Sequence, residues 1–343
     1  MIESRPLEGN GIAMDRLDEL RKWIAVQMPA ANSALAPASE DASFRRYFRL
    51  SHGGGTVIVM DAPPPHENCA AFVQVAELFR AAHVNVPTIL AQDLARGFLL
   101  LSDFGSTTFL DALNAESASQ LYEHAIDALI CIQSASRSDV LPPYDEALLL
   151  REVELFPQWY VARHRGMTLT RGQAEALEQA CARVIARNLA EPRVYVHRDY
   201  HSRNLMLTNP NPGILDFQDA VYGPLSYDLV SLLRDAYVEW PEERVLDWAV
   251  RYWQKARSRG LPVREDFAEF YRDFEWMGVQ RHLKVLGIFA RLYHRDGKNR
   301  YLNDLPLVLR YLERTARRYR ELSPLARVLD EIHSRPTAHG YTF

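Results

Sequence analysis

Residues 195–204 read Tyr-Val-His-Arg-Asp-Tyr-His-Ser-Arg-Asn, and an Asp-Phe pair follows at residues 216–217. The apolar residues that end at Val196 predict a buried strand, and the polar residues after it predict a loop. A second apolar run, at 213–215, predicts another short strand that leads to Asp216. Phosphoryl transfer needs a carboxylate that faces the attacking hydroxyl group, together with an Asn and an Asp that hold magnesium. The stretch therefore predicts the catalytic and metal loops of a kinase-like phosphotransferase.

Each residue type in this pattern suits one task. Asp199 is the expected catalytic residue, which orients the acceptor hydroxyl group and takes its proton late in the reaction. Asn204 and Asp216 are the expected metal ligands, because Mg²⁺ prefers oxygen donors. His197 is expected to brace the loop by hydrogen bonding. Asp228, in the first turn of a following apolar helix, is expected to support the loop from below.

Two other interpretations of this stretch remain open. It could be an ordinary polar connection between buried strands, in which the Asp and Asn side chains serve turns. It could also bind a transition metal, as in a hydrolase, through His197, Asp199 and His201, which alternate along the chain. The hydrolase interpretation gives Asn204 no role and predicts a tightly held metal.

Length and composition favour a two-lobed enzyme. The chain has 343 residues and a net charge of -4, which is enough length for two cores and gives no reason to expect nucleic acid or anionic membranes as partners. Its longest apolar runs are too short for a bilayer, and its N-terminus lacks the apolar segment of a signal peptide. The three cysteines are widely spaced, which argues against a disulfide framework or a zinc site. We expect a cytoplasmic protein that acts on a small molecule.

Hydrophobic periodicity predicts an α+β chain with a protein kinase-like, two-lobed fold. Residues 1–105 are the predicted N-lobe, a small β-sheet with helices that binds the nucleotide, and its hinge lies near 101–105. Its predicted elements are a helix at 14–28, strands at 33–38, 44–50 and 56–60, a helix at 70–82, and strands at 86–90 and 97–101. Residues 106–343 are the predicted helical C-lobe with the catalytic loop, the metal loop and the acceptor site. Its predicted helices span 117–134, 146–163, 170–188, 226–237, 242–257, 266–293 and 303–322, and the residues after Pro324 receive no predicted element.

ATP is expected to contact the N-lobe at two places. The turn between the first two strands, residues 39–44, contains no glycine, but the backbone around Ser43 and Phe44 could hold phosphate with help from Arg45 or Arg46. An ordinary strand pair with solvated arginines is the alternative. The backbone around Ser102 is expected to meet the adenine at the hinge. The Asp-Phe-Gly triplet at 103–105 precedes the catalytic loop by about a hundred residues, so it belongs to the hinge and not to the metal loop.

One feature speaks against an active kinase. Met60 stands where a phosphate-binding lysine is expected, and the chain has no lysine between Lys22 and Lys255. Either an arginine such as Arg46 supplies the positive charge, or the protein is a pseudoenzyme that binds nucleotide without turnover. The glycines at 53–55 do not replace a phosphate loop, because they fall between the second and third strands and predict a plain turn.

Taken together, these residues resemble the aminoglycoside phosphotransferase and choline kinase-like superfamily. The shared patterns are the His-x-Asp-x4-Asn loop, Leu-Leu-Leu-Ser-Asp-Phe-Gly at 99–105, and Gly-Pro-x-x-Tyr-Asp-Leu at 223–229. Within the superfamily, the chain looks most like the bacterial anomeric kinases of N-acetylmuramate and N-acetylglucosamine. The segments that carry this closer resemblance are 43–49, 59–64, 215–220 and 280–289.

This resemblance implies ATP-dependent phosphorylation of the C1 hydroxyl group of an amino sugar, in the recycling of peptidoglycan. It also implies that Val-Met-Asp at 59–61 is the normal form of the third strand. Other acceptors of the superfamily, namely choline, homoserine or an aminoglycoside, remain alternatives.

The residues themselves also favour a polar acceptor. Gln280, Arg281 and Lys284 share one face of an otherwise apolar helix and are candidates for binding sugar hydroxyls and a carboxylate, although a stripe of solvated surface charges is the alternative. Arg203 and Asp219 are further substrate-binding candidates, because they flank the catalytic and metal residues.

Overall fold

The computed structural model describes residues 9–29, 34–39 and 44–334. The chain divides into two compact units, one within residues 1–77 and 86–105 and the other within 78–85 and 106–343. Helix α2 (Cys69–Ala81) begins in the first unit and ends in the second. Among the described residues, every helix is too short or too polar to cross a membrane.

The first unit contains a five-stranded antiparallel sheet in the order β1-β2-β3-β5-β4. The strands are β1 (Ala36–Ser39), β2 (Arg46–His52), β3 (Gly55–Asp61), β4 (Ile89–Asp93) and β5 (Phe98–Ser102). Gly53 and Gly54 join β2 to β3 with φ angles of 51° and 88°, so the predicted plain hairpin turn is confirmed. Strand β4 begins three residues later than predicted, because Pro87 has no N–H to give to a sheet.

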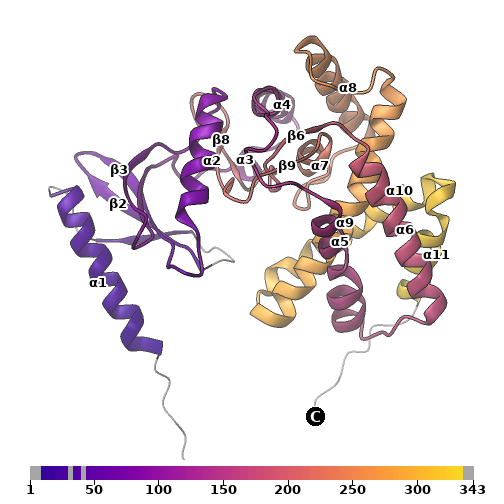
Figure 1. The fold of residues 1–343 in the computed structure, drawn as a ribbon, viewed down its shortest axis with the longest axis horizontal. Helices are drawn as coiled ribbons and strands as arrows, with labels where there is room; N and C mark the ends of the chain where they lie inside the picture. Colours follow the sequence, from indigo (N-terminus) through magenta and orange to yellow (C-terminus); the bar gives the residue numbers. More distant parts are fainter. Residues whose placement is uncertain (1–8, 30–33, 40–43, 335–343) are drawn as a thin grey trace, which may run out of the picture. The chain divides into compact units, whose positions relative to one another are not determined.

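Helix α1 (Gly9–Gln27) lies beside this sheet (Figure 1). Its buried residues Leu20, Trp23 and Ile24 pack on apolar side chains of β2, β3 and β5, among them Leu50 and Val59. Because side chains alternate along a strand, these apolar residues occupy one face of the sheet. The predicted small β-sheet lobe is thus confirmed as an element of the fold.

The second unit is mainly helical. Its α-helices are α3 (Phe109–Ala112), α4 (Ala118–Ser134), α5 (Glu146–Val153), α6 (Arg171–Leu189), α7 (Tyr227–Leu233), α8 (Glu242–Ser258), α9 (Phe267–Asp296), α10 (Leu305–Arg318) and α11 (Ser323–Ser334). A π-helix spans Phe156–His164, and 3₁₀ turns span Asn299–Asn303 and Arg320–Leu322. The long helix α9 packs on α5, α6, α7, α10 and the π-helix, so it forms the centre of this unit (Figure 1).

Two short β-pairs carry the polar loops of the second unit. Strand β6 (Arg193–Val196) pairs with β9 (Val221–Pro224), and β7 (Leu205–Met206) pairs with β8 (Gly213–Ile214). The catalytic-loop residues follow β6, and the metal-loop residues follow β8. Each loop therefore follows a short buried strand, as the sequence predicted.

Two predicted helices end earlier than expected, and one helix was not predicted. The helix expected at 146–163 stops at Val153 and continues as a π-helix, because Pro157 cannot donate the α-helical hydrogen bond to Val153. The helix expected at 226–237 ends at Leu233, where Arg234 leaves helical geometry with φ -120° and ψ 52°. Helix α11 (Ser323–Ser334), for which no element was predicted, buries an apolar stripe.

Candidate active site

The start of the catalytic loop is anchored by one buried carboxylate. The backbone N–H of His197 donates to Oδ2 of Asp228 at 2.6 Å, and the N–H of Arg198 donates to Oδ1 at 3.0 Å. Arg198 has a φ of 77°, which is uncommon for a residue with a side chain. Burial raises the pKa of Asp228 to about 7, although both N–H donors favour its charged form. Asp228 thereby fixes an unusual backbone turn directly before Asp199.

The buried ring of His197 connects the two loops. Its Nε2 atom lies 2.9 Å from the carbonyl oxygen of Leu215, and its Nδ1 atom lies 3.2 Å from the N–H of Asp199. A neutral ring satisfies both contacts, and burial lowers the pKa of His197 to about 4. With both nitrogens used, His197 cannot bind a metal, and no group of three His, Cys, Asp or Glu side chains in the described part of the chain is arranged to do so. These contacts give the hydrolase interpretation no support.

The carboxylate of Asp199 is partly exposed and accepts no hydrogen bond from the described residues. Burial raises its pKa, but the nearby Lys284, His201, Arg281 and Arg198 lower it more, so that the pKa falls to about 2. The carboxylate is consequently ionised at neutral pH. It can accept a hydrogen bond from a hydroxyl group that enters the site.

Asn204 and Asp216, the two predicted metal ligands, lie together. The Nδ2 atom of Asn204 donates to the carbonyl oxygen of Asp199 at 2.9 Å and lies 3.5 Å from Oδ2 of Asp216. Asp216 has a φ of 61°, and its Oδ1 accepts from Nε2 of Gln218 at 2.8 Å. The same amide reaches Oδ2 of Asp219 at 3.3 Å. These hard oxygen donors fit Mg²⁺, which needs few protein ligands.

The three candidates on α9 are buried, so the alternative of a solvated surface stripe is wrong. Gln280, Arg281 and Lys284 are 0%, 4% and 5% exposed. Their polar atoms bind the protein itself: Arg281 donates to the carbonyl oxygen of Arg198 at 3.1 Å, and Lys284 donates to the hydroxyl group of Tyr227 at 2.9 Å. Because their donors bind other protein groups, these three side chains support the catalytic loop from the protein interior.

Glu152, at the end of α5, is the centre of this buried network and was not among the predicted site residues. Its Oε1 accepts from Arg198 at 2.6 Å and from Lys284 at 3.0 Å. Its Oε2 accepts from the hydroxyl group of Tyr144 and from Gln280, the latter at 3.0 Å. Burial raises the pKa of Glu152, but its cationic partners lower it more, to about 2. A lone Glu in an amphipathic helix gives no sequence signal for such a role.

A second missed carboxylate holds the far end of the loop. Asp235 is 1% exposed, and it accepts from the N–H of Ser202 at 2.9 Å and from the N–H of Tyr237 at 3.1 Å. Arg203 follows Ser202 and lies over the ring of Tyr237. Asp228 and Asp235 both fall in the segment that was predicted as one helix, and their spacing of seven residues is the only signal that could have suggested paired anchors.

The nucleotide-binding candidates belong to the first unit. Ser43 lies outside the described residues. Phe44 is 65% exposed and stacks on His66 with 4.9 Å between ring centroids. The backbone N–H of Ser102 donates to the carbonyl oxygen of Thr88 at 2.9 Å, so this donor is already used within the sheet.

Arg46 and Met60 bear on the missing lysine. Met60 is fully buried in β3, and its neighbour Asp61 is also fully buried. Asp61 forms ion pairs with both Arg46 and Arg16, whose Nε atoms lie 3.0 Å and 2.9 Å from its two oxygens. Two cations on one carboxylate leave a net positive charge beside β3. The structure thus places arginines near the position where a lysine was expected.

Comparisons with known proteins agree with this geometry. Residues 34–269 match the sequence model of the phosphotransferase enzyme family. An N-acetylmuramate/N-acetylglucosamine kinase from Neisseria meningitidis is 51% identical over 336 residues, which is 96% of this chain and 100% of that protein.

Solved structures share the fold at low identity. The choline kinase LicA from Streptococcus pneumoniae superposes with a TM-score of 0.63 at 12% identity, over 88% of this chain and 99% of that one. The ADP-bound aminoglycoside phosphotransferase APH(2'')-Ib gives a TM-score of 0.56 at 14% identity, over 85% and 97%. The predicted kinase-like fold is confirmed. With a family match over more than half of its length and a relative of 51% identity along nearly all of it, this chain belongs to the phosphotransferase enzyme family.

Proposed function

We propose that this protein is an ATP-dependent kinase that phosphorylates the C1 hydroxyl group of N-acetylmuramate and N-acetylglucosamine. The observation that carries the reaction type is the ionised Asp199 carboxylate, which accepts no hydrogen bond from the described residues. The choice of acceptor comes from the relative of 51% identity that is named for these two sugars. Such a kinase serves peptidoglycan recycling in the cytoplasm.

Asp199 is proposed to position the acceptor and to take its proton. Its low pKa makes it a weak base, but the transition state of phosphoryl transfer is loose and depends more on position than on basicity. An anomeric hydroxyl group is also more acidic than an ordinary alcohol, which reduces the demand on the base. The charges of Lys284 and Arg281 keep the carboxylate ionised.

Asn204 and Asp216 are proposed to hold Mg²⁺, which neutralises the phosphates of ATP when it is bound. Phe44, Arg46 and Ser102 remain the proposed contacts to ATP in the first unit, with Ser43 as a further candidate. Asp219 and Arg203 are proposed to face the acceptor. For Gln280, Arg281 and Lys284, burial supports a different role from the one first expected: they position the catalytic loop through Glu152 and Arg198.

The test is ADP release from ATP and magnesium over a panel of acceptors: N-acetylmuramate, N-acetylglucosamine, glucose, choline, homoserine and kanamycin. We expect turnover of the two N-acetyl sugars, with phosphate on C1 in the ³¹P NMR spectrum of the product. Asp199→Asn should lower kcat by about 10²- to 10⁴-fold, since an amide cannot take the proton. Asp247→Asn, a change on the exposed side of α8, is the matched control and should leave kcat unchanged.

Other outcomes would correct specific parts of the proposal. Turnover of choline, homoserine or kanamycin alone would keep the mechanism and replace the acceptor. ATP binding without turnover of any acceptor would identify a pseudoenzyme, the alternative raised by Met60.

A further inference from the structure

Arg203 is a cation with unused hydrogen-bond donors close to the catalytic residue. Its guanidinium carbon lies 3.6 Å from the centre of the Tyr237 ring, and its side chain is 35% exposed. Its only ion-pair partner within the described residues is Asp304, at the long distance of 3.9 Å, and it donates no hydrogen bond to them. A guanidinium group that stacks on a ring presents its N–H donors at the edge of its plane, where they fit the two oxygens of a carboxylate.

The other cations near Asp199 are already occupied. Lys284 binds Glu152 at 3.0 Å and the hydroxyl group of Tyr227 at 2.9 Å. Arg198 binds Glu152 at 2.6 Å. Arg281 is 4% exposed and donates to the carbonyl oxygen of Arg198 at 3.1 Å. An anionic group of an acceptor would therefore find its free partner in Arg203.

Arg203 and Asp199 are linked through His201 and Tyr237. The N–H of His201 donates to the carbonyl oxygen of Asp199 at 3.0 Å. The His201 ring lies edge-on to Tyr237, with 5.4 Å between centroids, and Tyr237 carries Arg203 on its face. Arg203 and Asp199 also both act electrostatically on His201 and on Tyr237, which places both charged groups close to these two rings.

The two proposed acceptors differ by one charged group. N-acetylmuramate carries a lactyl ether on C3 that ends in a carboxylate, whereas N-acetylglucosamine has a hydroxyl group there. C3 lies two ring atoms from C1, so a sugar with its C1 hydroxyl group at Asp199 extends its lactyl carboxylate about one ring width away. We propose that Arg203 binds this carboxylate and thereby sets the preference of the enzyme between the two sugars. This inference rests on the proposed function.

Tyr237 and Asp304 hold the Arg203 side chain in position. Tyr237 supports the flat face of the guanidinium group and leaves its edge open. Asp304 attracts the group but is too distant to satisfy its donors. The side chain is consequently held in place before the acceptor arrives, which reduces the entropy that binding must overcome.

The test compares kcat/KM for N-acetylmuramate and N-acetylglucosamine in the wild type, Arg203→Gln and Arg203→Lys. For Arg203→Gln we expect the ratio of the two values, muramate over glucosamine, to fall about tenfold or more, since hydrogen bonds to charged groups are strong. Arg203→Lys should give a ratio between those of Arg203→Gln and the wild type, because lysine keeps the positive charge but cannot form two parallel hydrogen bonds to a carboxylate. Arg244→Gln removes another stacked arginine, over Trp240, and should leave the ratio unchanged. An unchanged ratio in Arg203→Gln, or an equal loss for both sugars, would overturn the inference.

A second measurement needs no variant and covers the case in which Arg203→Gln does not fold. The wild type is given N-acetylmuramate with its carboxylate converted to the amide. We expect kcat/KM for the amide to fall towards the value for N-acetylglucosamine, and equal use of acid and amide would overturn the inference. A wild type that phosphorylates neither sugar would instead refute the proposed function, and this inference with it.

Discussion

The charges of Arg198, Lys284 and Arg281 act on Asp199, and two of these cations also bind Glu152. Glu152 receives donors from Arg198, Lys284, Tyr144 and Gln280, so that both of its oxygens are saturated. A buried ion pair contributes little net stability when it is complete, but it is costly to break, since the remaining charge stays buried. Glu152 therefore controls both the stability of the second unit and the position of Arg198 beside Asp199.

Glu152→Gln should destabilise the protein by about 3–5 kcal/mol, because Arg198 and Lys284 would share a neutral partner. Urea unfolding at pH 7 measures this loss, and kcat for the sugar acceptors should fall with it. The folded pKa of about 2 lies below the ordinary 4.5, so the stabilisation by Glu152 is present above pH 4.5 and disappears as the pH falls towards 2. Glu154→Gln is the matched control, since Glu154 is exposed. Equal stability of the two variants at pH 7 would contradict this role.

At the level of residues, the sequence patterns identified site residues that lie close together in the chain. They missed residues that only the fold brings to the site. His197, Asp199, Asn204 and Asp216 stand within one short stretch, and the structure brings them together with bonds such as that from Asn204 to the Asp199 carbonyl oxygen. Glu152 lies 46 residues from Arg198 in the sequence, and only the folded chain brings the two side chains together. The burial of Lys284 was equally hidden, because a charged residue on an apolar helix gives the same pattern whether its partner is water or a distant carboxylate.

At the level of elements, the order of strands and helices was predictable and several ends were not. Thr170 and Gln173 form a capping box at the start of α6, and this bond pattern is local enough to be visible in the sequence. The end of α7 depends instead on Arg234, whose guanidinium group binds Glu275 at 2.8 Å and Thr315 at 3.0 Å. These partners are far away in the sequence, so no local signal marks the end of the helix.

The contact between α9 and the segment that leads into the π-helix sets the position of Glu152. A Cβ atom on Gly287 would lie 2.4 Å from the carbonyl carbon of Leu155, which is backbone and cannot move aside cheaply. Gly287 thus allows α9 to approach the residues directly after α5. The close approach brings Lys284, less than one turn earlier, within reach of Glu152.

Gly287→Ala should destabilise the protein by about 1–3 kcal/mol, because the added methyl group overpacks this contact. Urea unfolding measures the change in stability. Steady-state kinetics measure the local effect: kcat should fall by a larger factor than KM rises, because the catalytic loop loses its support. Gly172→Ala is the matched control, because nothing lies within 4 Å of the added Cβ in α6. That change should stabilise the protein by up to about 1 kcal/mol through helix propensity. A Gly287→Ala protein as stable as Gly172→Ala would show that the contact is loose.

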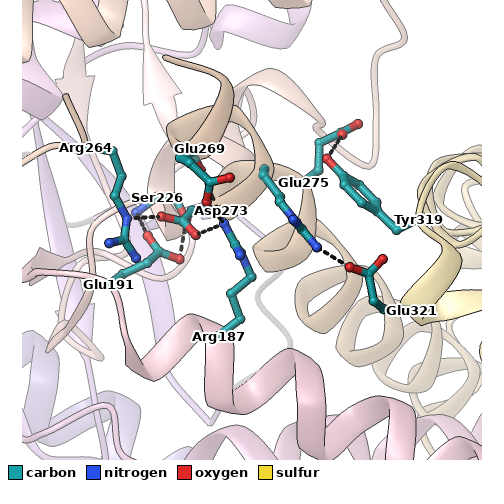
Figure 2. A network of polar contacts seen from close by, with 10 residues as sticks. Arg187, Glu191, Ser226, Arg264, Glu269, Asp273, Glu275, Tyr319 and Glu321 are labelled. Carbon is teal, nitrogen blue, oxygen red and sulfur yellow. Dashed lines mark hydrogen bonds and ion pairs between the residues drawn. The ribbon is translucent and has the colours of Figure 1, made fainter. Parts of the chain in front are cut away.

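At the scale of the whole molecule, a second buried polar network joins α6, α7 and α9 away from the catalytic loop (Figure 2). Asp273 of α9 pairs with Arg187 at 2.8 Å and with Arg264 at 2.9 Å. Glu191, 5% exposed, follows α6 and accepts from both the N–H and the hydroxyl group of Ser226, each at 2.9 Å. Burial, and then repulsion by Asp273, raise the pKa of Glu191 to about 8, while Ser226 and Arg264 oppose the rise.

This carboxyl group makes global stability depend on pH. The folded protein keeps the Glu191 proton between pH 4.5 and about 8, whereas the unfolded chain has lost it, so stability should decrease as the pH rises through this range. Glu191→Gln can accept from the N–H of Ser226 through its amide oxygen and donate to the Ser226 hydroxyl oxygen through its amide nitrogen, and it cannot ionise. Its stability relative to the wild type should therefore increase between pH 5 and pH 8, by on the order of 1 kcal/mol per pH unit. Urea unfolding, followed by circular dichroism at several pH values, measures this difference. Glu178→Gln, an exposed change on α6, should run parallel to the wild type. If Glu191→Gln also runs parallel, Glu191 is charged in the folded protein and Arg264 compensates for its burial.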